Sequence, residues 1–213
     1  MEKKKLKKIF FINKTLLEML KDRNYNINIE IKNFDGFKKE NLNKNKKEIY
    51  EKLSYIFEKE KTKEKIKIFF CLNLQKINES NINEFKVELD KEKIKRCIII
   101  IKNNKRDLTL NTKKKIEQLN KEKYIFEIFK NIELFTNITN SKLVSKHRIL
   151  TNEEVLDLLK KYSITIDQLP IISISDPMAK YHGMEDGQIC EIERESETSG
   201  KTLFYRLCKN QIK

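Results

Sequence analysis

The sequence predicts two domains: an α/β domain over residues 1–140, in which helices cover a sheet, and a small α+β domain over residues 141–213. Two observations support this division. In the first part, runs with helical spacing of apolar residues alternate with short, almost wholly apolar runs that are typical of buried strands. Both prolines and three of the four glycines fall within the last 45 residues, where they are expected at positions that need their backbone shapes.

The charge of the chain is divided in the same way. Its 46 basic and 32 acidic residues give a net charge of +14, whereas residues 141–213 hold 11 basic and 11 acidic residues. All of the excess therefore lies in residues 1–140. A basic domain suits a polyanion such as nucleic acid, and a neutral one must bind by shape and apolar contact. A second interpretation stays open, since a composition rich in Lys, Asn and Ile also fills solvent-facing positions without any partner.

The first domain begins with a helical pattern. Apolar positions from Ile9 to Leu20 have helical spacing, and the predicted helix ends near Asn24. A short alternating run over residues 27–31 predicts a strand, and residues 42–57 return to helical spacing.

The strongest strand signals follow. Residues 66–72 and 97–101 are nearly all apolar, as expected for strands buried on both faces. Residues 82–95 and 113–121 predict helices, and residues 125–129 predict an extended segment. Helices that alternate with apolar strands indicate a sheet covered by helices.

Local signals define the second domain. Thr151 and Glu154 form a predicted capping box that starts a helix. Asp176 precedes Pro177 at the first position of a further predicted helix, which stops at Gly183. Extended segments are predicted from Leu169 to Ile174 and over residues 188–194 and 202–208, the last two as an antiparallel pair. A domain of about 70 residues has a thin core, so its specialised turns are expected to serve a docking surface.

The last 45 residues also contain an ordered set of short motifs: Leu-Pro at 169–170, Asp-Pro-x-Ala-x-Tyr-x-Gly at 176–183, Gly-x-x-x-x-Ile-x-Arg at 187–194, Ser-Glu-Thr-Ser-Gly at 196–200 and Tyr-Arg at 205–206. In order and spacing, this set resembles the C-terminal assembly module of the fifth subunit of eukaryotic nuclear RNA polymerases, a family that includes its archaeal counterpart. The first part resembles the same family more weakly. Its Asp-Arg-Asn-Tyr at 22–25 stands where the family's first helix exits on Asp-Arg-Gly-Tyr.

The resemblance implies a non-catalytic subunit of a multisubunit DNA-directed RNA polymerase. It implies that residues 1–140 are a jaw domain with a restriction-endonuclease-like α/β core near downstream duplex DNA, and that residues 141–213 dock on the largest subunit. Carried over position by position, the implied interface residues are Asp176, Pro177, Tyr181, Gly183, Gly187, Arg194, Glu197, Thr198, Gly200, Tyr205 and Arg206. Arg194, Glu197 and Arg206 are the strongest contact candidates, because polar residues held by a tight hairpin have no obvious folding role.

One segment departs from the family. Where the family has a short turn with Gly and a Thr-Pro-Ser-Ala motif facing the DNA duplex, residues 102–112 form a longer turn without Gly or Pro. Five basic residues in and after this turn suit phosphate contacts: Lys102, Lys105, Arg106, Lys113 and Lys114. A helix that begins after Thr112 would add free backbone N–H groups. The alternative interpretation is a plain surface loop.

No motif predicts catalysis by this chain. Four cysteines lie far apart in the sequence: Cys71, Cys97, Cys190 and Cys208. With only His147 and His182 beside them, a zinc site is not expected. Residues 84–86 spell the Glu-x-Lys of a nuclease, but this triplet arises by chance in a chain rich in Glu and Lys, and Glu84 lies in a predicted helix. We therefore expect no catalytic residue, metal or cofactor.

The expected partners are the largest polymerase subunit, other polymerase subunits and, weakly and without sequence preference, downstream DNA. No 18-residue apolar stretch occurs, so no membrane is expected. The expected location is inside the cell with the polymerase, which is the nucleus for a cellular eukaryotic member and the host cytoplasm or virion for a viral one. Two alternatives remain: a free-standing nucleic-acid-binding protein with steep salt dependence, and a relic nuclease that needs magnesium and Glu84.

Overall fold

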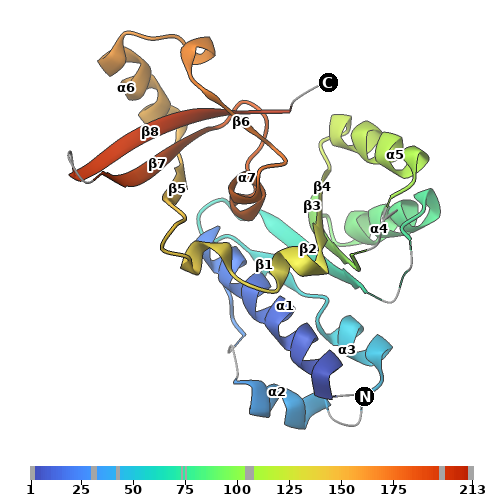
Figure 1. Cartoon of the computed structure of the whole chain (residues 1–213). Helices are drawn as coiled ribbons and strands as arrows, with labels where there is room; N and C mark the ends of the chain where they lie inside the picture. Colours follow the sequence, from blue (N-terminus) through green and yellow to red (C-terminus); the bar gives the residue numbers. More distant parts are fainter. Residues whose placement is uncertain are drawn as a thin grey trace. The chain divides into compact units, whose positions relative to one another are not determined.

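The computed structural model of the chain describes residues 3–29, 33–41, 44–72, 74, 76–103, 108–196 and 200–210. The chain divides into two compact units, Met1–Thr136 and Asn137–Lys213, called the first and second unit below. Figure 1 shows both in the colours of the sequence. None of the described helices is long and apolar enough to cross a membrane.

The first unit contains a four-stranded sheet with the order β1-β2-β3-β4. Its strands are β1 (Ile56–Glu58), β2 (Lys65–Cys71), β3 (Arg96–Ile101) and β4 (Ile125–Lys130). β1 is antiparallel to β2, whereas β2, β3 and β4 are parallel. Every residue of β3 is buried, as is typical of a central strand between two layers of helices. The strands predicted over residues 66–72 and 97–101 and the extended segment predicted over residues 125–129 are therefore confirmed.

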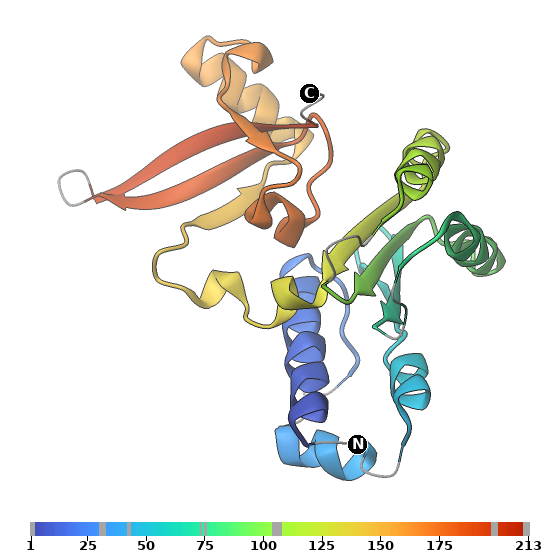
Figure 2. The same cartoon turned by 45° about the vertical axis from the view of Figure 1, so that its right-hand side comes forward.

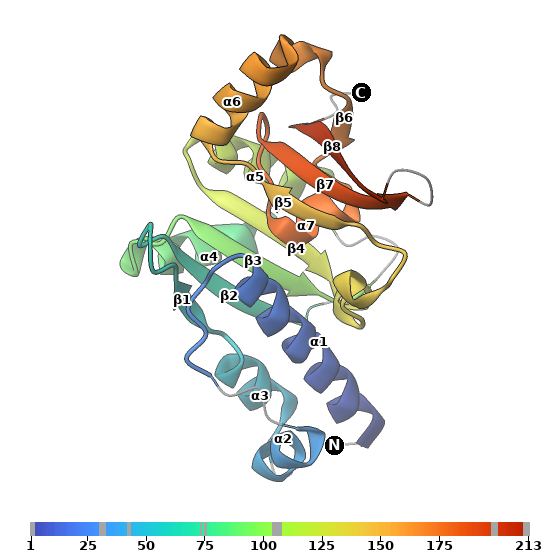
Figure 3. The same ribbon diagram turned by 90° about the vertical axis from the view of Figure 1, so that its left-hand side faces the viewer.

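Helices cover both faces of this sheet, as Figures 2 and 3 show. α4 (Glu79–Lys91) and α5 (Leu110–Lys121) connect the parallel strands and lie on one face. Residues of both helices form a core cluster there with alternate residues of the strands, such as Phe69 and Ile99. α1 (Lys3–Asp22) lies on the opposite face.

Three short elements complete the first unit. α2 (Phe34–Asn41) and α3 (Lys46–Lys52) lie near the N-terminal end of α1, where the ring of Phe10 contacts Phe34 and Phe37 at centroid distances of 5.5 Å. The 3₁₀ helix η1 (Asn131–Leu134) follows β4.

Three helices of the first unit end in the same way. Asn24, Lys93 and Lys123 follow α1, α4 and α5 and have φ angles of 64°, 55° and 67°. In each case the N–H of the next residue donates to the carbonyl five residues before it, in the last helical turn. This is the Schellman arrangement, in which a left-handed residue lets the chain turn back and satisfies a helical carbonyl. Asn24 thus stands at the predicted end of the first helix.

Two predictions for the part of the first unit before β2 are wrong. Residues 27–29 form no strand, and the rest of that predicted segment lies outside the described residues. Ile27 and Ile29 line a cavity instead of joining a ladder. The helix predicted over residues 42–57 is α3 alone, because the carbonyl of Tyr55 accepts the N–H of Ile68 and so leads the chain into the sheet.

A buried series of charges joins the exit of α1 to the sheet. The carboxylate of Glu127 in β4 accepts hydrogen bonds from both terminal nitrogens of Arg23, at 3.1 and 2.8 Å, and from Nε of Arg96 at 2.8 Å. Arg96 also reaches Glu64 at 3.1 Å, and Glu64 binds Lys59 at 2.6 Å. The side chains of Arg23, Arg96 and Glu127 are only 4%, 8% and 13% exposed.

The two arginines decide the protonation of this carboxylate. Burial alone would raise the pKa of Glu127, but the nearby charges and hydrogen bonds of Arg23 and Arg96 outweigh it and hold the pKa below its usual value. Glu127 is therefore an anion that pairs with two buried cations at once.

The second unit contains a four-stranded sheet with the order β5-β7-β8-β6. β5 (Lys146–Ile149), β7 (Ile189–Ser196) and β8 (Gly200–Lys209) pair antiparallel, and β6 (Ile171–Ser173) pairs parallel with β8. The 3₁₀ helices η2 (Ile138–Asn140) and η3 (Ile166–Gln168) lie in the connections.

Each face of this second sheet carries one helix. A cluster with Ala179 of α7 (Pro177–His182) contains Cys190 and Cys208. A separate cluster with Leu158 of α6 (Asn152–Tyr162) contains Ile189 and Leu207. The second unit thus has two small cores instead of one.

The predicted helix signals of the second unit are confirmed. The hydroxyl oxygen of Thr151 accepts the N–H of Glu154 at 3.3 Å, and the Glu154 carboxylate accepts the N–H of Thr151 at 2.8 Å. Asp176 accepts the N–H of Met178 at 2.8 Å, with the proline at the first helical position. Gly183 ends α7 with a φ of 63°.

We predict that Glu127→Gln lowers the free energy of unfolding by about 3–5 kcal/mol, because it removes the negative charge that two buried guanidinium groups share. Urea unfolding at neutral pH measures the change. Glu117→Gln is the matched control, since Glu117 is exposed on α5 and its substitution should change stability by less than about 0.5 kcal/mol. Equal losses in the two variants would contradict the role assigned to Glu127.

The same group gives a pH dependence. The folded pKa of Glu127 is depressed, so its stabilising effect is complete above the unfolded pKa of about 4.3 and is lost as the pH falls through the folded pKa. The stability gap between the wild type and Glu127→Gln should therefore narrow when urea unfolding is repeated at progressively lower pH. A gap that stays constant over this range would mean that Glu127 has the same pKa in the folded and unfolded states, which would contradict the depressed folded pKa.

Candidate docking surface

The β7–β8 hairpin extends beyond the core of the second unit. The strands pair from Ile189 opposite Leu207 to Ser196 opposite Gly200. The two core clusters use only the inner part of the hairpin, as far as Ile192 and Tyr205. Gly200 has a φ of +67°, a conformation that glycine adopts without strain. The outer part of the hairpin therefore carries side chains outside both cores.

Arg194, Phe204 and Arg206 share one face of this hairpin, because side chains alternate along each strand and the register places them on the same side as Ile192. The guanidinium carbon of Arg194 lies 4.9 Å from the centre of the Phe204 ring, a cation–π contact. Phe204 is 44% exposed, Arg194 is exposed and Arg206 is half-buried. We call these three residues the hairpin surface; they suit a partner with an apolar pocket bordered by acceptors.

The opposite face of the hairpin is partly covered by its own unit. Tyr205 is half-buried, its ring lies 6.2 Å from that of Tyr162, and its hydroxyl donates to Glu191 at 3.3 Å. Burial first, and then the charge of Glu191, raise the pKa of Tyr205. Leu203 on this face is 48% exposed. Tyr205 thus lies at the edge of the α6 cluster.

Several predicted interface residues shape the α7 segment. Asp176, Pro177 and Gly183 define the two ends of α7. The N–H of Gly187, which has a φ of +86°, donates to the Cys208 carbonyl at 2.8 Å. Tyr181 is only 4% exposed. These local roles explain the residue types, and the partner contact expected at these positions stays a prediction.

Two further predicted contacts, Glu197 and Thr198, lie outside the described residues. The structure places Arg194 and Arg206 on the same face of the hairpin as Phe204. Phe204 and Leu203 were not predicted from the sequence as contact residues. The sequence held part of the signal for these two residues. The alternating strand pattern of β8 extends over more residues than the two small cores can bury.

The basic residues predicted to meet DNA are only partly described. Lys102, Lys113 and Lys114 are exposed, and Lys105 and Arg106 lie outside the described residues. Lys102 directly follows β3, and the other two lie in the first turns of α5. The structure therefore places these three side chains in solvent, and their contact with DNA stays a prediction.

The predicted start of the helix after this turn is wrong. α5 begins at Leu110, not after Thr112, and its N-cap is Thr109, whose side-chain oxygen accepts the N–H of Thr112 at 3.2 Å. The hydroxyl of Thr112 donates to the Ile77 carbonyl at 3.0 Å, which buries Thr112. A threonine cap thus uses an N–H group that was expected to be free for phosphate.

The residue types that nuclease or metal chemistry would need are dispersed. Glu84 is exposed on α4, and Lys86 binds Glu122 at 2.8 Å. Within the described ranges, no group of three or more His, Cys, Asp or Glu side chains is placed to hold a metal ion. The four cysteines are buried free thiols, and burial, with a smaller effect of Glu88, raises the pKa of Cys71 to about 12.

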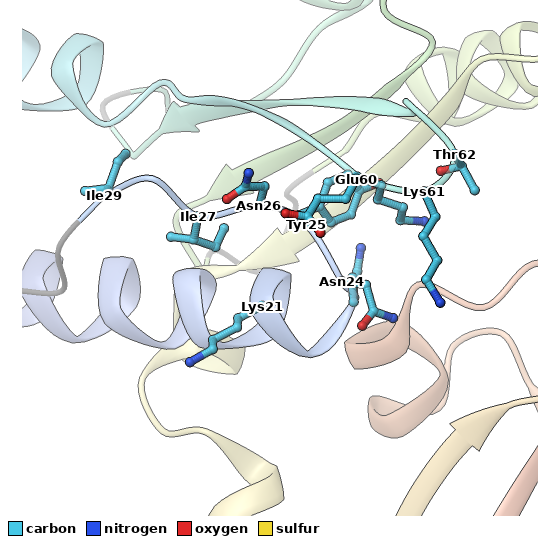
Figure 4. Close-up of a pocket in the computed structure, with 11 residues that line it drawn as sticks. Lys21, Asn24, Tyr25, Asn26, Ile27, Ile29, Glu60, Lys61 and Thr62 are labelled. Atoms are coloured by element: carbon cyan, nitrogen blue, oxygen red, sulfur yellow. The ribbon is translucent and has the colours of Figure 1, made fainter.

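A cavity of about 780 Å³ opens where α1 ends in the first unit. Figure 4 shows the residues that line it, which come from the end of α1, the segment after it and the turn between β1 and β2. The charged residues of its lining are four cations and one carboxylate: Lys21, Arg23, Lys59, Lys61 and Glu60. No periodic pattern marks this cavity in the sequence, because its walls come from three separate segments.

Comparison with known proteins identifies the family. The RNA polymerase Rpb5 N-terminal domain family matches residues 3–89, and the RNA polymerase Rpb5 C-terminal domain family matches residues 136–208. The chain is 33% identical over 207 residues to the Dictyostelium discoideum protein "DNA-directed RNA polymerases I, II, and III subunit rpabc1", covering 95% of this chain and 98% of the relative.

Other relatives carry similar descriptions. Identity is 36% over 132 residues to the Caenorhabditis elegans subunit RPABC1 of RNA polymerases I, II and III, covering 62% of this chain and 61% of that protein. It is 31% over 206 residues to the Arabidopsis thaliana "DNA-directed RNA polymerase subunit 5-like protein 1", with coverage of 93% and 94%. Both units of the structure fall within these matches, and the chain therefore belongs to the Rpb5 family of RNA polymerase subunits.

Proposed function

We propose that this chain acts as a non-catalytic subunit of a DNA-directed RNA polymerase and joins the enzyme through its second unit, with residues 141–213 docking on the largest subunit. Membership of the Rpb5 family over nearly the whole chain supports the role as a subunit. The observation that carries the docking proposal is the hairpin surface, in which Arg194 and Arg206 flank a partly exposed Phe204.

The hairpin surface has the properties of a binding hot spot. Arginine and aromatic residues are enriched where protein interfaces are strongest. These side chains stand on paired strands, so little conformational entropy of the backbone is lost on binding. The charges of residues 141–213 balance, which leaves shape and apolar contact as the main sources of affinity. The partner that fits is a rigid protein surface with a pocket for the Phe204 ring and acceptors for the two guanidinium groups.

The first unit has a different task in this proposal. It is the jaw beside downstream duplex DNA, and the net charge of +14 within residues 1–140 supports this. Lys102, Lys113 and Lys114 are exposed for phosphate contact. Their contacts would be weak and independent of base sequence. A mixed sheet with helices on both faces is compatible with the restriction-endonuclease-like core that the resemblance implies.

Co-purification tests the docking proposal. The tagged chain is co-expressed with the largest polymerase subunit from the same source and washed at high salt. Arg194→Glu and Phe204→Ser should each weaken retention at least about 30-fold, as expected for hot-spot residues. Lys160→Glu is the matched control, because it makes the same charge change at an exposed position of α6.

Deletion of residues 141–213 should abolish retention. Wild-type-like retention of Arg194→Glu and Phe204→Ser, with loss on deletion, would move the interface elsewhere in the second unit. A wild-type chain that elutes alone and holds DNA at low salt would replace the proposal with a free-standing nucleic-acid-binding protein.

The DNA contact has a separate test in the assembled polymerase. The double variant Lys113→Glu and Lys114→Glu should weaken the hold on downstream DNA and lower the slope of log affinity against log salt by about 0.9 for each lost phosphate contact. Lys91→Glu with Lys95→Glu makes the same charge change at exposed positions around the end of α4. Equal slopes of log affinity against log salt for the two double variants would contradict a DNA contact at the start of α5.

A further inference from the structure

A second cavity of the first unit, of about 360 Å³, is distinct in character from the basic one at the end of α1. Its size is within the range of pockets that hold small organic groups. Most of its lining is aromatic or aliphatic: Phe10, Leu17, Ile29, Phe37, Leu53 and Tyr55. The charged side chains that also line it, Lys14, Glu40 and Lys52, are each partly exposed, and Lys52 binds Glu40 at 3.1 Å.

Two buried amide oxygens line this cavity without a partner. Asn13 of α1 and Asn41 of α2 are 8% and 2% exposed. Neither Oδ1 atom has a hydrogen-bond partner within the part of the chain that the structure describes. A buried acceptor that makes no hydrogen bond is costly and rare in folded proteins. Two of them in one cavity call for a donor, and the described residues place none on either oxygen.

The orientation of both amides is set by their nitrogen atoms. Nδ2 of Asn41 donates to the Phe37 carbonyl at 2.8 Å, which assigns the other amide atom as oxygen. Burial raises the pKa of Tyr55, and a hydrogen bond from Asn13 partly offsets this, as expected when the amide nitrogen donates to the phenol oxygen. The Asn41 oxygen is therefore an acceptor that requires an N–H or O–H group, and the Asn13 oxygen is a second one when its nitrogen donates to Tyr55.

The surroundings narrow the ligand further. Lys14 and Lys52 disfavour a cation, and the unpartnered oxygens disfavour a phosphate or carboxylate. An aromatic lining favours an aromatic body. Indole N–H is a donor with no acceptor lone pair, whereas a phenol would bring a further oxygen against the two already present.

We propose that this cavity binds the indole ring of a tryptophan side chain presented by a partner polypeptide, whose N–H donates to the amide oxygen of Asn13 or Asn41. Tryptophan is among the residues that most often anchor protein interfaces. The proposal concerns the first unit alone and does not depend on the hairpin surface or on DNA contact. It adds a protein-binding site to the basic unit.

The chain contains no tryptophan, so a tryptophan probe can be followed by its own fluorescence at the red edge of indole absorption. The probe is N-acetyl-tryptophanamide, and the matched probe carries a methyl group on the indole nitrogen. The full-length chain should bind the first probe about five-fold more tightly, the effect of one hydrogen bond to a buried acceptor. The side-chain amide signals of Asn13 and Asn41 should shift in NMR spectra.

Asn13→Leu and Asn41→Leu each remove one acceptor and keep a side chain of similar size. At least one of them should abolish the preference for the unmethylated probe, whereas Asn83→Leu, at an exposed position of α4, should leave it unchanged. Thermal unfolding checks that each variant folds. If neither leucine variant folds, the proposal is tested by the affinities of the wild-type chain for the two probes and by the shifts of its Asn13 and Asn41 amide signals.

Three results would overturn the proposal. Equal affinity for the two probes would exclude a role for the indole N–H. The proposal would also fail if neither probe binds and a crystal soaked with the probe shows only water on the two amide oxygens. The cavity would then be a hydrated one. A preference that persists in both folded leucine variants would place the probe elsewhere.

Discussion

The first unit depends on one carboxylate that pairs with two buried arginines. Apolar contacts between α1 and the sheet are not directional, so by themselves they would allow the helix to slide along the strands. Glu127 removes this freedom, because Arg23 stands at the exit of α1 and Arg96 at the start of the central strand. Sliding the helix would break a charged hydrogen bond in a setting where an unpaired charge is strongly unfavourable. Glu64 and Lys59 extend the same constraint to the turn between β1 and β2.

Much of this first unit was predictable from sequence, since its central strands are runs of apolar residues too short for helices. The ion pair between Arg23 and Glu127 shows the limit of such reasoning. Arg23 and Glu127 are 104 residues apart in the chain, and nothing in either local sequence indicates that they meet. The failed helix prediction over residues 42–57 has a similar cause. Phe57 fits a helical pattern, but hydrogen bonding with β2 makes it part of a strand.

The candidate site was predictable to a similar degree. Arg194 and Arg206 were selected because a tight hairpin holds them, and the structure places them on one face with Phe204. Phe204 was missed because its exposure depends on how far the hairpin extends past two thin cores, which is a tertiary property. The cavities were missed for the same reason. The division of apolar residues between two faces leaves the outer part of the hairpin supported by strand pairing and outside both cores.

The helix exits of the first unit show how this fold tolerates an unusual composition. Glycine is the residue that best fits a left-handed helix end. Here Lys93 and Lys123 occupy this position after α4 and α5, and each left-handed lysine lowers the free energy of unfolding by roughly 1 kcal/mol. The backbone turn survives because its hydrogen bonds and the strands that follow specify it independently of the side chain. Such a position can therefore hold lysine in place of glycine without a change of fold. Each exchange lowers thermal tolerance slightly and leaves the architecture unchanged.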